Sequence, residues 1–315
     1  MKVLFLLFHL KISLVYSDIA VKIVQGCYAN NQTTICRGIH VYLRKFNLMA
    51  LYKFYYGLLA TLCLCSLSTY AQKELPQQNT LFTVGHAGAF IGGLYDAFYP
   101  YSKLKQHGDF GLGAPDKLDG ELLVLDGKIY QTQHTGKTFE VKDTELTPFS
   151  VVNFFHADKA FKTIARLTKD KLYAYLDSVM PNQNGIYAIR IKGSFKTIKT
   201  RAFPPVTKKP YSPLADMLPL QKFFTFDNIS GTLVGYRIPA FMDGPNITGY
   251  HFHFLSDDKQ KGGHIIDLLA ENITIEVDQM DSFTIDLPQT KEFVNFDFSK
   301  DRREEVKRVE NGKKN

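Results

Sequence analysis

Cysteine is scarce in this chain and confined to one end of it. All four cysteines lie within the first 65 of 315 residues: Cys27, Cys36, Cys63 and Cys65. Beyond them, neither a disulfide framework nor a thiol nucleophile is available. The sequence also lacks nucleotide-binding glycine fingerprints, a G-x-S-x-G elbow and internal repeats. Its folded part must therefore rest on an apolar core, and 45% hydrophobic residues permit a large one.

The excess of positive charge is confined to the same end. The formal net charge is +7, which would suggest a nucleic-acid or membrane partner. Residues 1–71 hold seven of the 38 Lys and Arg residues and one of the 31 acidic residues, which leaves 31 basic against 30 acidic residues from Gln72 onward. Because that part is nearly neutral, we expect neither a nucleic-acid partner nor membrane binding for it.

Residues 49–71 have the pattern of a secretory signal peptide. A short segment with Lys53 precedes the apolar run 57–65, and small residues lead up to Ala71. The run is too short for a comfortable transmembrane helix. We therefore expect cleavage near Ala71 and export to the periplasm or the exterior. We interpret residues 1–48 as an upstream extension that is not part of the fold.

Alternating and continuous apolar runs predict a chain made mostly of β-strands. We expect strands over residues 81–84, 121–125, 128–131, 149–155, 249–254 and 264–269. The best helical periodicity covers residues 160–179, and residues 186–202 resemble a hairpin that turns at Lys192-Gly193. A proline-rich connector begins at residue 204, so we place an N-terminal β-rich half at 72–203 and a C-terminal metal-binding half at 204–315.

Three histidines flank a turn in the second half. His251 and His253 alternate with aromatic residues, so a strand would place both imidazoles on one face. The Gly262-Gly263 pair then ends a polar turn, and His264 opens the next strand beside the first. Three imidazoles on a hairpin form a metal-ligand set that leaves coordination positions open for water or substrate. The alternative is three surface histidines.

The local sequence around three charged residues does not by itself assign them a function. Glu121 opens an apolar strand, Arg201 ends a polar one, and Glu310 lies in a highly charged tail. Taken alone, the patterns are equally typical of an edge carboxylate, a surface arginine and a solvated tail.

Several stretches together resemble the α-acetolactate decarboxylase family. They are residues 108–113 (GDFGLG), 118–122 (LDGEL), 200–201 (TR), 209–214 (KPYSPL), 249–255 (GYHFHFL) and 263–264 (GH). They occur in family order across residues 81–310. One departure is Ala114-Pro115, where members often have Thr-Phe, and it removes a hydroxyl near the substrate.

The resemblance implies an α+β fold of two β-rich halves, with partly barrel-like mixed and antiparallel sheets, few helices and the metal between the halves. It also implies a zinc ion held by His251, His253 and His264, and a homodimer. Glu121, Arg201 and Glu310 would surround the metal, and Glu310 corresponds to the acidic residue that the C-terminal tail of the family contributes.

The implied reaction is the decarboxylation of (S)-2-acetolactate to (R)-acetoin and CO₂, and it suits these residue types. Loss of CO₂ from a β-keto acid leaves an enediolate, which zinc and a guanidinium such as that of Arg201 would stabilise. Glu121 or Glu310 would supply the proton, and the sequence does not choose between them. No organic cofactor is needed.

Two other classes of protein remain open at this point. A cupin also uses H-x-H and a later histidine, but its pattern needs a glutamate where this chain has Asp257 and Asp258. An exported zinc-binding module without catalytic activity would need neither Glu121 nor Arg201.

Overall fold

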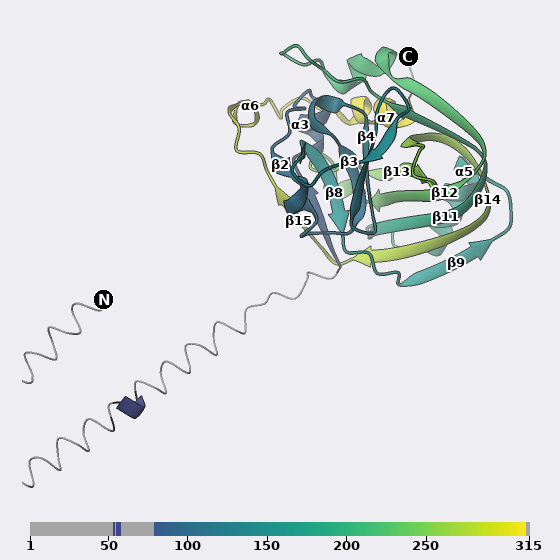
Figure 1. The fold of residues 1–315 in the computed structure, drawn as a ribbon, viewed down its shortest axis with the longest axis horizontal. Helices are drawn as coiled ribbons and strands as arrows, with labels where there is room; N and C mark the ends of the chain where they lie inside the picture. Colours follow the sequence, from purple (N-terminus) through teal and green to yellow (C-terminus); the bar gives the residue numbers. More distant parts are fainter. Residues whose placement is uncertain (1–52, 54, 58–78, 313–315) are drawn as a thin grey trace, which may run out of the picture. The chain divides into compact units, whose positions relative to one another are not determined.

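The computed structural model describes residues 53, 55–57 and 79–312. The expected signal peptide and upstream extension fall almost wholly outside these residues, so both stay predictions. Within the described part, no helix is long and apolar enough to cross a membrane. Residues 79–312 form a fold that consists mainly of strands (Figure 1).

The elements follow one another in this order along the chain. The strands are β1 (Thr80–Val84), β2 (Tyr99–Pro100), β3 (Phe110–Ala114), β4 (Glu121–Leu125), β5 (Lys128–Thr132), β6 (Thr138–Glu140), β7 (Leu146–Thr147), β8 (Phe149–Asn153), β9 (Lys159–Thr163), β10 (Leu167–Thr168), β11 (Ile186–Ala202), β12 (Lys222–Ile238), β13 (Gly249–Ser256), β14 (Gly262–Met280) and β15 (Ser282–Asp286). The helices are α3 (Ala87–Ile91), α4 (Tyr101–Leu104), α5 (Lys169–Val179), α6 (Lys291–Val294) and α7 (Arg303–Asn311), with 3-10 turns η1 (Asp116–Leu118), η2 (Leu214–Leu220) and η3 (Ala240–Met242).

The first sheet has seven strands in the order β15-β1-β8-β3-β4-β5-β6. It is mixed, because β1 and β15 run parallel while the other neighbours are antiparallel. Every residue of β3, β4 and β8 is buried, and their largely apolar sequences suit strands covered on both faces. The predicted turn at Asp126-Gly127 joins β4 to β5, and both turn residues have positive φ, as a tight two-residue hairpin turn requires.

The second sheet closes on itself through the long strand β14. β11, β12 and β13 pair in succession, and β14 pairs with both β11 and β13. Four antiparallel strands thus form a ring-like sheet, to which β9 and β10 are added along β14. Figure 1 shows β11, β12 and β14 as long, curved strands. The predicted α+β class with a partly barrel-like sheet is confirmed.

The helix expected over residues 160–179 is wrong in its first half. That half forms β9 and β10, which pair with β14, and the helix α5 begins only at Lys169. The side-chain oxygen of Thr168 accepts a hydrogen bond from the Lys171 amide and caps the helix there. Phe161, whose spacing suggested a helix, packs as a strand residue against the second sheet. Pairing with β14 overrides the local periodicity.

The hairpin expected over residues 186–202 is also wrong, because β11 is one continuous strand. Its pairing with β14 shifts register between Gly193 and Ser194, so the glycine belongs to a bulge. A Cβ at Gly193 would lie 2.4 Å from the carbonyl oxygen of Asn272. The glycine is therefore required by the close approach of β14, and the uninterrupted strand continues to Arg201.

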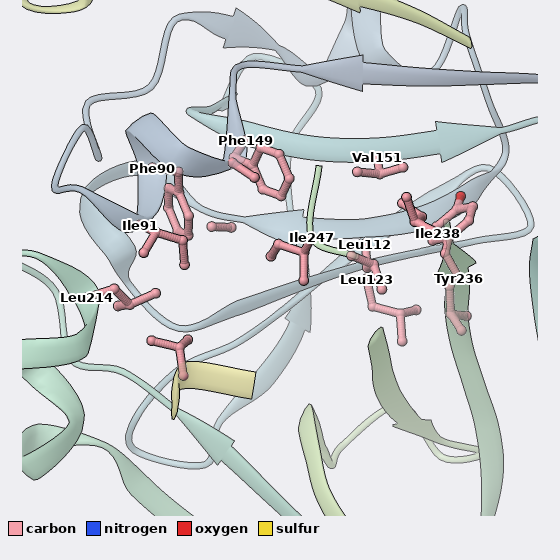
Figure 2. Close-up of a cluster of buried hydrophobic side chains, with 14 of the residues drawn as sticks. Phe90, Ile91, Leu112, Leu123, Phe149, Val151, Leu214, Tyr236, Ile238 and Ile247 are labelled. Carbon is pink, nitrogen blue, oxygen red and sulfur yellow. The ribbon is translucent and has the colours of Figure 1, made fainter. Parts of the chain in front are cut away.

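The largest cluster of buried apolar side chains joins the two sheets. Figure 2 shows Leu112 and Leu123 of the first sheet near Tyr236 and Ile238 of β12. Packing between the sheets fixes the position of β4 relative to the ring-like sheet. The division at residues 203/204 stays a prediction, and the second sheet contains strands from both sides of it.

Candidate active site and metal centre

The structure brings together the three histidines of the β13–β14 hairpin. His251 and His253 share one face of β13, and His253 lies directly opposite His264 in the antiparallel register. The Nε2 atoms of His251 and His253 are 3.2 Å apart, and the Nε2 of His251 lies 3.1 Å from the Nδ1 of His264. The exposed fractions of the three residues are 9%, 2% and 2%, so the surface-histidine alternative is wrong.

The hydrogen bonding and burial of these histidines fit a metal ion. A carbonyl oxygen can only accept, so the Nδ1–H of His253 donates to the Leu122 carbonyl at 2.6 Å and its Nε2 keeps a lone pair. Burial lowers the pKa of His253 to about 3 and holds the pKa values of His251 and His264 well below the usual range. Neutral imidazoles are the form that binds metal. Their ligand atoms all lie within 4.8 Å of one another.

Glu121 and Arg201 form a buried ion pair beside the histidines. Glu121 is the first residue of β4. Arg201 lies directly opposite His264 in the β11–β14 pairing, so the side chains of Arg201 and His264 lie on the same face of the sheet. The Nη1 of Arg201 donates to the Oε1 of Glu121 at 2.7 Å, and the Oε2 of Glu121 is 3.5 Å from the Nε2 of His253. Neither residue is a surface charge.

Three groups hold the guanidinium of Arg201 in place. Besides the pair with Glu121, its Nη2 donates to the Val309 carbonyl at 3.3 Å. Its Cζ lies 4.6 Å from the centre of the Phe203 ring, a cation–π contact. The buried Nε–H has no hydrogen-bond partner among the described residues.

The C-terminal segment folds back over this cluster as α7. Val309 is 1% exposed within the main core, which anchors the last turn. The Oε2 of Glu310 is 3.9 Å from the Nε2 of His251 and 3.9 Å from the Nε2 of His264. The Glu310 carbonyl accepts from the Nε2 of His264 at 3.3 Å. The solvated-tail alternative is wrong for this residue.

Burial raises the pKa values of Glu121 and Glu310 to about 7. The positive charge of Arg201 lowers both pKa values, but its effect is smaller than that of burial. The charge of Glu121 further raises the pKa of Glu310. Two carboxyl groups that can hold a proton near neutral pH thus face a histidine cluster. Such carboxyl groups suit general acid–base catalysis.

A small cavity of about 30 Å³ lies at this cluster. It is lined by the three histidines, Glu121, Arg201 and Glu310, together with apolar residues that include Phe90, Ile91, Phe149, Leu214 and Ile247. Ala114 also lines it, at the point where a threonine would have added a hydroxyl. Figure 2 shows Phe90, Phe149 and Ile247 close to one another. The cavity therefore combines an apolar wall with a polar cluster whose histidines could hold a metal ion.

Comparison with known proteins identifies the family. A sequence profile described as alpha-acetolactate decarboxylase matches residues 81–300. The chain belongs to the α-acetolactate decarboxylase family. The alpha-acetolactate decarboxylase of Methanosarcina mazei is 38% identical over 232 residues, which cover 74% of this chain and 80% of the relative. That of Bacillus subtilis is 35% identical, and the match covers 73% of this chain and 91% of the relative.

The fold agrees with this assignment. The crystal structure of alpha-acetolactate decarboxylase from Bacillus subtilis strain 168 superposes with a TM-score of 0.71 at 33% identity. The superposition covers 73% of this chain and 99% of that one. Acetolactate decarboxylases are carboxy-lyases, so the chain is an enzyme of that class, and the cupin and non-enzymatic alternatives are wrong.

The structure thus collects all six residues singled out in the sequence at one cavity. Glu310 lies beyond residue 300, where the profile match ends, and its position depends on α7. Sequence reasoning missed Phe203 beneath Arg201 and the Leu122 carbonyl that orients His253. It also missed Phe90 in the apolar wall. Residue 203 directly follows the arginine strand, but nothing in its local pattern reveals the stacking.

Proposed function

We propose that this chain is a zinc-dependent enzyme that converts (S)-2-acetolactate to (R)-acetoin and CO₂. The observation that carries the proposal is the convergence of three neutral histidines, an Arg–Glu pair and a second glutamate on one buried cavity. Membership of the acetolactate decarboxylase family supplies the substrate and the reaction class.

Zinc is the metal that we assign to His251, His253 and His264. Three imidazoles with open positions are a common ligand set of catalytic zinc, and the Leu122 carbonyl provides the usual outer partner for one of them. When bound, zinc would supply a Lewis acid for the hydroxyl and ketone oxygens of the substrate. Other divalent metals also bind imidazole, so metal analysis of the purified chain tests this assignment.

Arg201 has the position and charge to bind the substrate and stabilise the transition state. As CO₂ leaves, the electron pair of the C1–C2 bond moves toward the ketone oxygen and gives an enediolate. A buried guanidinium with a free Nε–H can orient the carboxylate and then stabilise the developing negative charge. Because Phe203, Glu121 and Val309 already fix the group, little reorganisation is needed.

We assign the proton transfer to Glu310. Glu121 is bound directly to Arg201 at 2.7 Å, a contact that favours its ionised form. Among the described residues, Glu310 forms no ion pair with an arginine or a lysine, and its pKa of about 7 leaves a proton available near neutral pH. Delivery of that proton to one face of C2 would give a single acetoin enantiomer.

We also propose that the protein is exported, begins at Gln72 after cleavage and acts as a homodimer. The signal pattern of residues 49–71 motivates the first two points, and the family resemblance motivates the third. Mass spectrometry of secreted or periplasmic protein tests the cleavage. An intact 315-residue chain in the cytoplasm would contradict it, and light scattering tests the dimer.

The function is tested by metal removal and restoration. We expect about one zinc per purified chain, loss of acetoin formation after chelation, and its recovery when zinc is added back. A metal-free preparation that still forms acetoin at the original rate would contradict the proposal.

A further inference from the structure

Two hollows of different size share a single wall. The cavity at the histidines measures about 30 Å³, and a groove of about 510 Å³ lies on the other side of α3. Within the described part of the chain, Phe90 is the one residue that lines both. A space of about 30 Å³ accommodates roughly two water molecules. The alkyl groups of a bound ligand would therefore be in direct contact with the residues that line it.

Phe90 differs from the rest of that wall because it also lines the groove, whereas its neighbour Ile91 in α3 lines only the small cavity. Phe90 belongs to the five-residue helix α3 and is 6% exposed. Its ring stacks on Phe149 with centroids 5.6 Å apart and meets Tyr95 edge-on at 5.3 Å. Phe149 lies in β8, which is paired on both sides, and it lines the small cavity but not the groove. Phe90 is therefore the point at which the linings of the two spaces meet.

The groove beyond Phe90 suits an aliphatic chain. Its lining includes Leu94, Phe98, Phe293 and Phe296. The charges at its edge are already paired, since Lys209 bonds to Asp96 and lies 3.8 Å from Glu292. The Tyr211 hydroxyl donates to the same aspartate at 2.9 Å. The groove therefore offers mainly apolar surface to a ligand, and its charged groups, two carboxylates that share one lysine, lie at its edge.

We propose that Phe90 limits the size of the C2 alkyl group of the substrate. This inference rests on the proposed function, in which the oxygens of a 2-hydroxy-3-oxo acid lie at the histidines and Arg201. The C2 alkyl group then faces the apolar lining, where the Phe90 ring leaves room for a short group. Truncating Phe90 joins the cavity to the groove, so 2-hydroxy-3-oxo acids with longer C2 chains become ligands.

The test compares affinities for two unreactive analogues. They are 2,3-dihydroxybutanoates with a 2-methyl or a 2-butyl group, which keep the vicinal oxygens but cannot lose CO₂ because the ketone is reduced. Calorimetry on the zinc-loaded full chain gives the ratio of the two dissociation constants. The variants are Phe90→Ala, Phe90→Leu and, as the matched control, Phe149→Leu, each checked for zinc content and thermal unfolding.

We expect Phe90→Ala to shift the ratio at least tenfold toward the butyl compound, because each methylene that a pocket accepts or rejects changes binding by about tenfold or more. Phe90→Leu should shift it less but in the same direction, and it decides the matter if the alanine variant does not fold. Phe149→Leu should shift the ratio less than Phe90→Leu does, because Phe149 lines the small cavity but not the groove. A folded, zinc-loaded Phe90 variant with an unchanged ratio would overturn the inference, as would an equal shift in Phe149→Leu.

The experiments distinguish failure of the size limit proposed for Phe90 from failure of the proposed decarboxylase activity. A wild-type chain that binds both analogues but forms no acetoin would refute the decarboxylation proposal, and the affinity ratio would still decide the role of Phe90. Acetoin formation together with an unchanged ratio would refute the size limit alone.

Discussion

Replacing Arg201 tests both the stability of the buried ion pair and the catalytic role proposed for its guanidinium. Its side chain is 4% exposed and pairs at 2.7 Å with Glu121, which is 10% exposed. Arg201→Ala leaves the carboxylate buried without its cation, and breaking one side of a buried pair typically costs about 3–5 kcal/mol. For a fold of this size, that corresponds to a fall in Tm of roughly 6–20 °C. Combining the change with Glu121→Gln removes the stranded charge and should recover much of the loss.

The conservative variant Arg201→Lys separates stability from catalysis. A lysine can pair with Glu121 but lacks the fork that also reaches the Val309 carbonyl, and it loses the planar stacking on Phe203. We expect the metal to be retained and the stability loss to stay below that of the alanine variant. Turnover should nevertheless fall on the order of 10²–10³-fold, since one preorganised donor is lost.

The assays are urea unfolding at constant metal content and initial rates of acetoin formation. An Arg201→Ala variant that unfolds like the wild type would show that the ion pair contributes nothing to stability, against the expectation above. The catalytic role of Arg201 is refuted if Arg201→Lys forms acetoin at the wild-type rate.

Three further predictions concern other parts of the fold. Glu310→Gln, or truncation after Val309, should keep the zinc and lower turnover by about 10²-fold or more, because the proton carrier is lost. Turnover at the wild-type rate in either variant would show that Glu310 does not transfer the proton. His253→Ala should lower zinc content by elemental analysis and abolish activity, and a variant that keeps both would contradict the ligand set. Burial raises the pKa of Asp278 to about 6, so this group's contribution to stability falls by up to about 3 kcal/mol as pH rises from 4 to 6. Asp278→Asn should remove that fall and be more stable at pH 7, and an unchanged slope in urea unfolding from pH 4 to 7 would count against it.

The fold was predictable where local chemistry decides it. The Asp126-Gly127 pair supports positive φ, so the β4–β5 hairpin could be identified from sequence. Residues 160–179 have a helical period only in part, and the first half is held as strand by β14, far along the chain. Gly193 resembles a turn residue locally, but it is required by the close approach of β14. Both errors arise because long-range pairing outweighs local preference.

The site was predictable to the extent that its residues lie in short motifs. The three histidines follow from a strand period and one turn, whereas Glu121 and Arg201 gain meaning only from the family resemblance. Glu310 has no motif, and its place depends on the neighbouring Val309, which anchors the last turn of α7 in the core. Phe90 could not be found from sequence, because its role arises only where α3 separates two cavities.

The most direct test of the central claim is the chirality of the product. The zinc-loaded chain is incubated with racemic acetolactate, and the acetoin is resolved by chiral gas chromatography against a chelated control. The account predicts metal-dependent formation of (R)-acetoin as a single enantiomer, because one buried carboxyl group delivers the proton. Racemic acetoin, or no acetoin above the control, would contradict it.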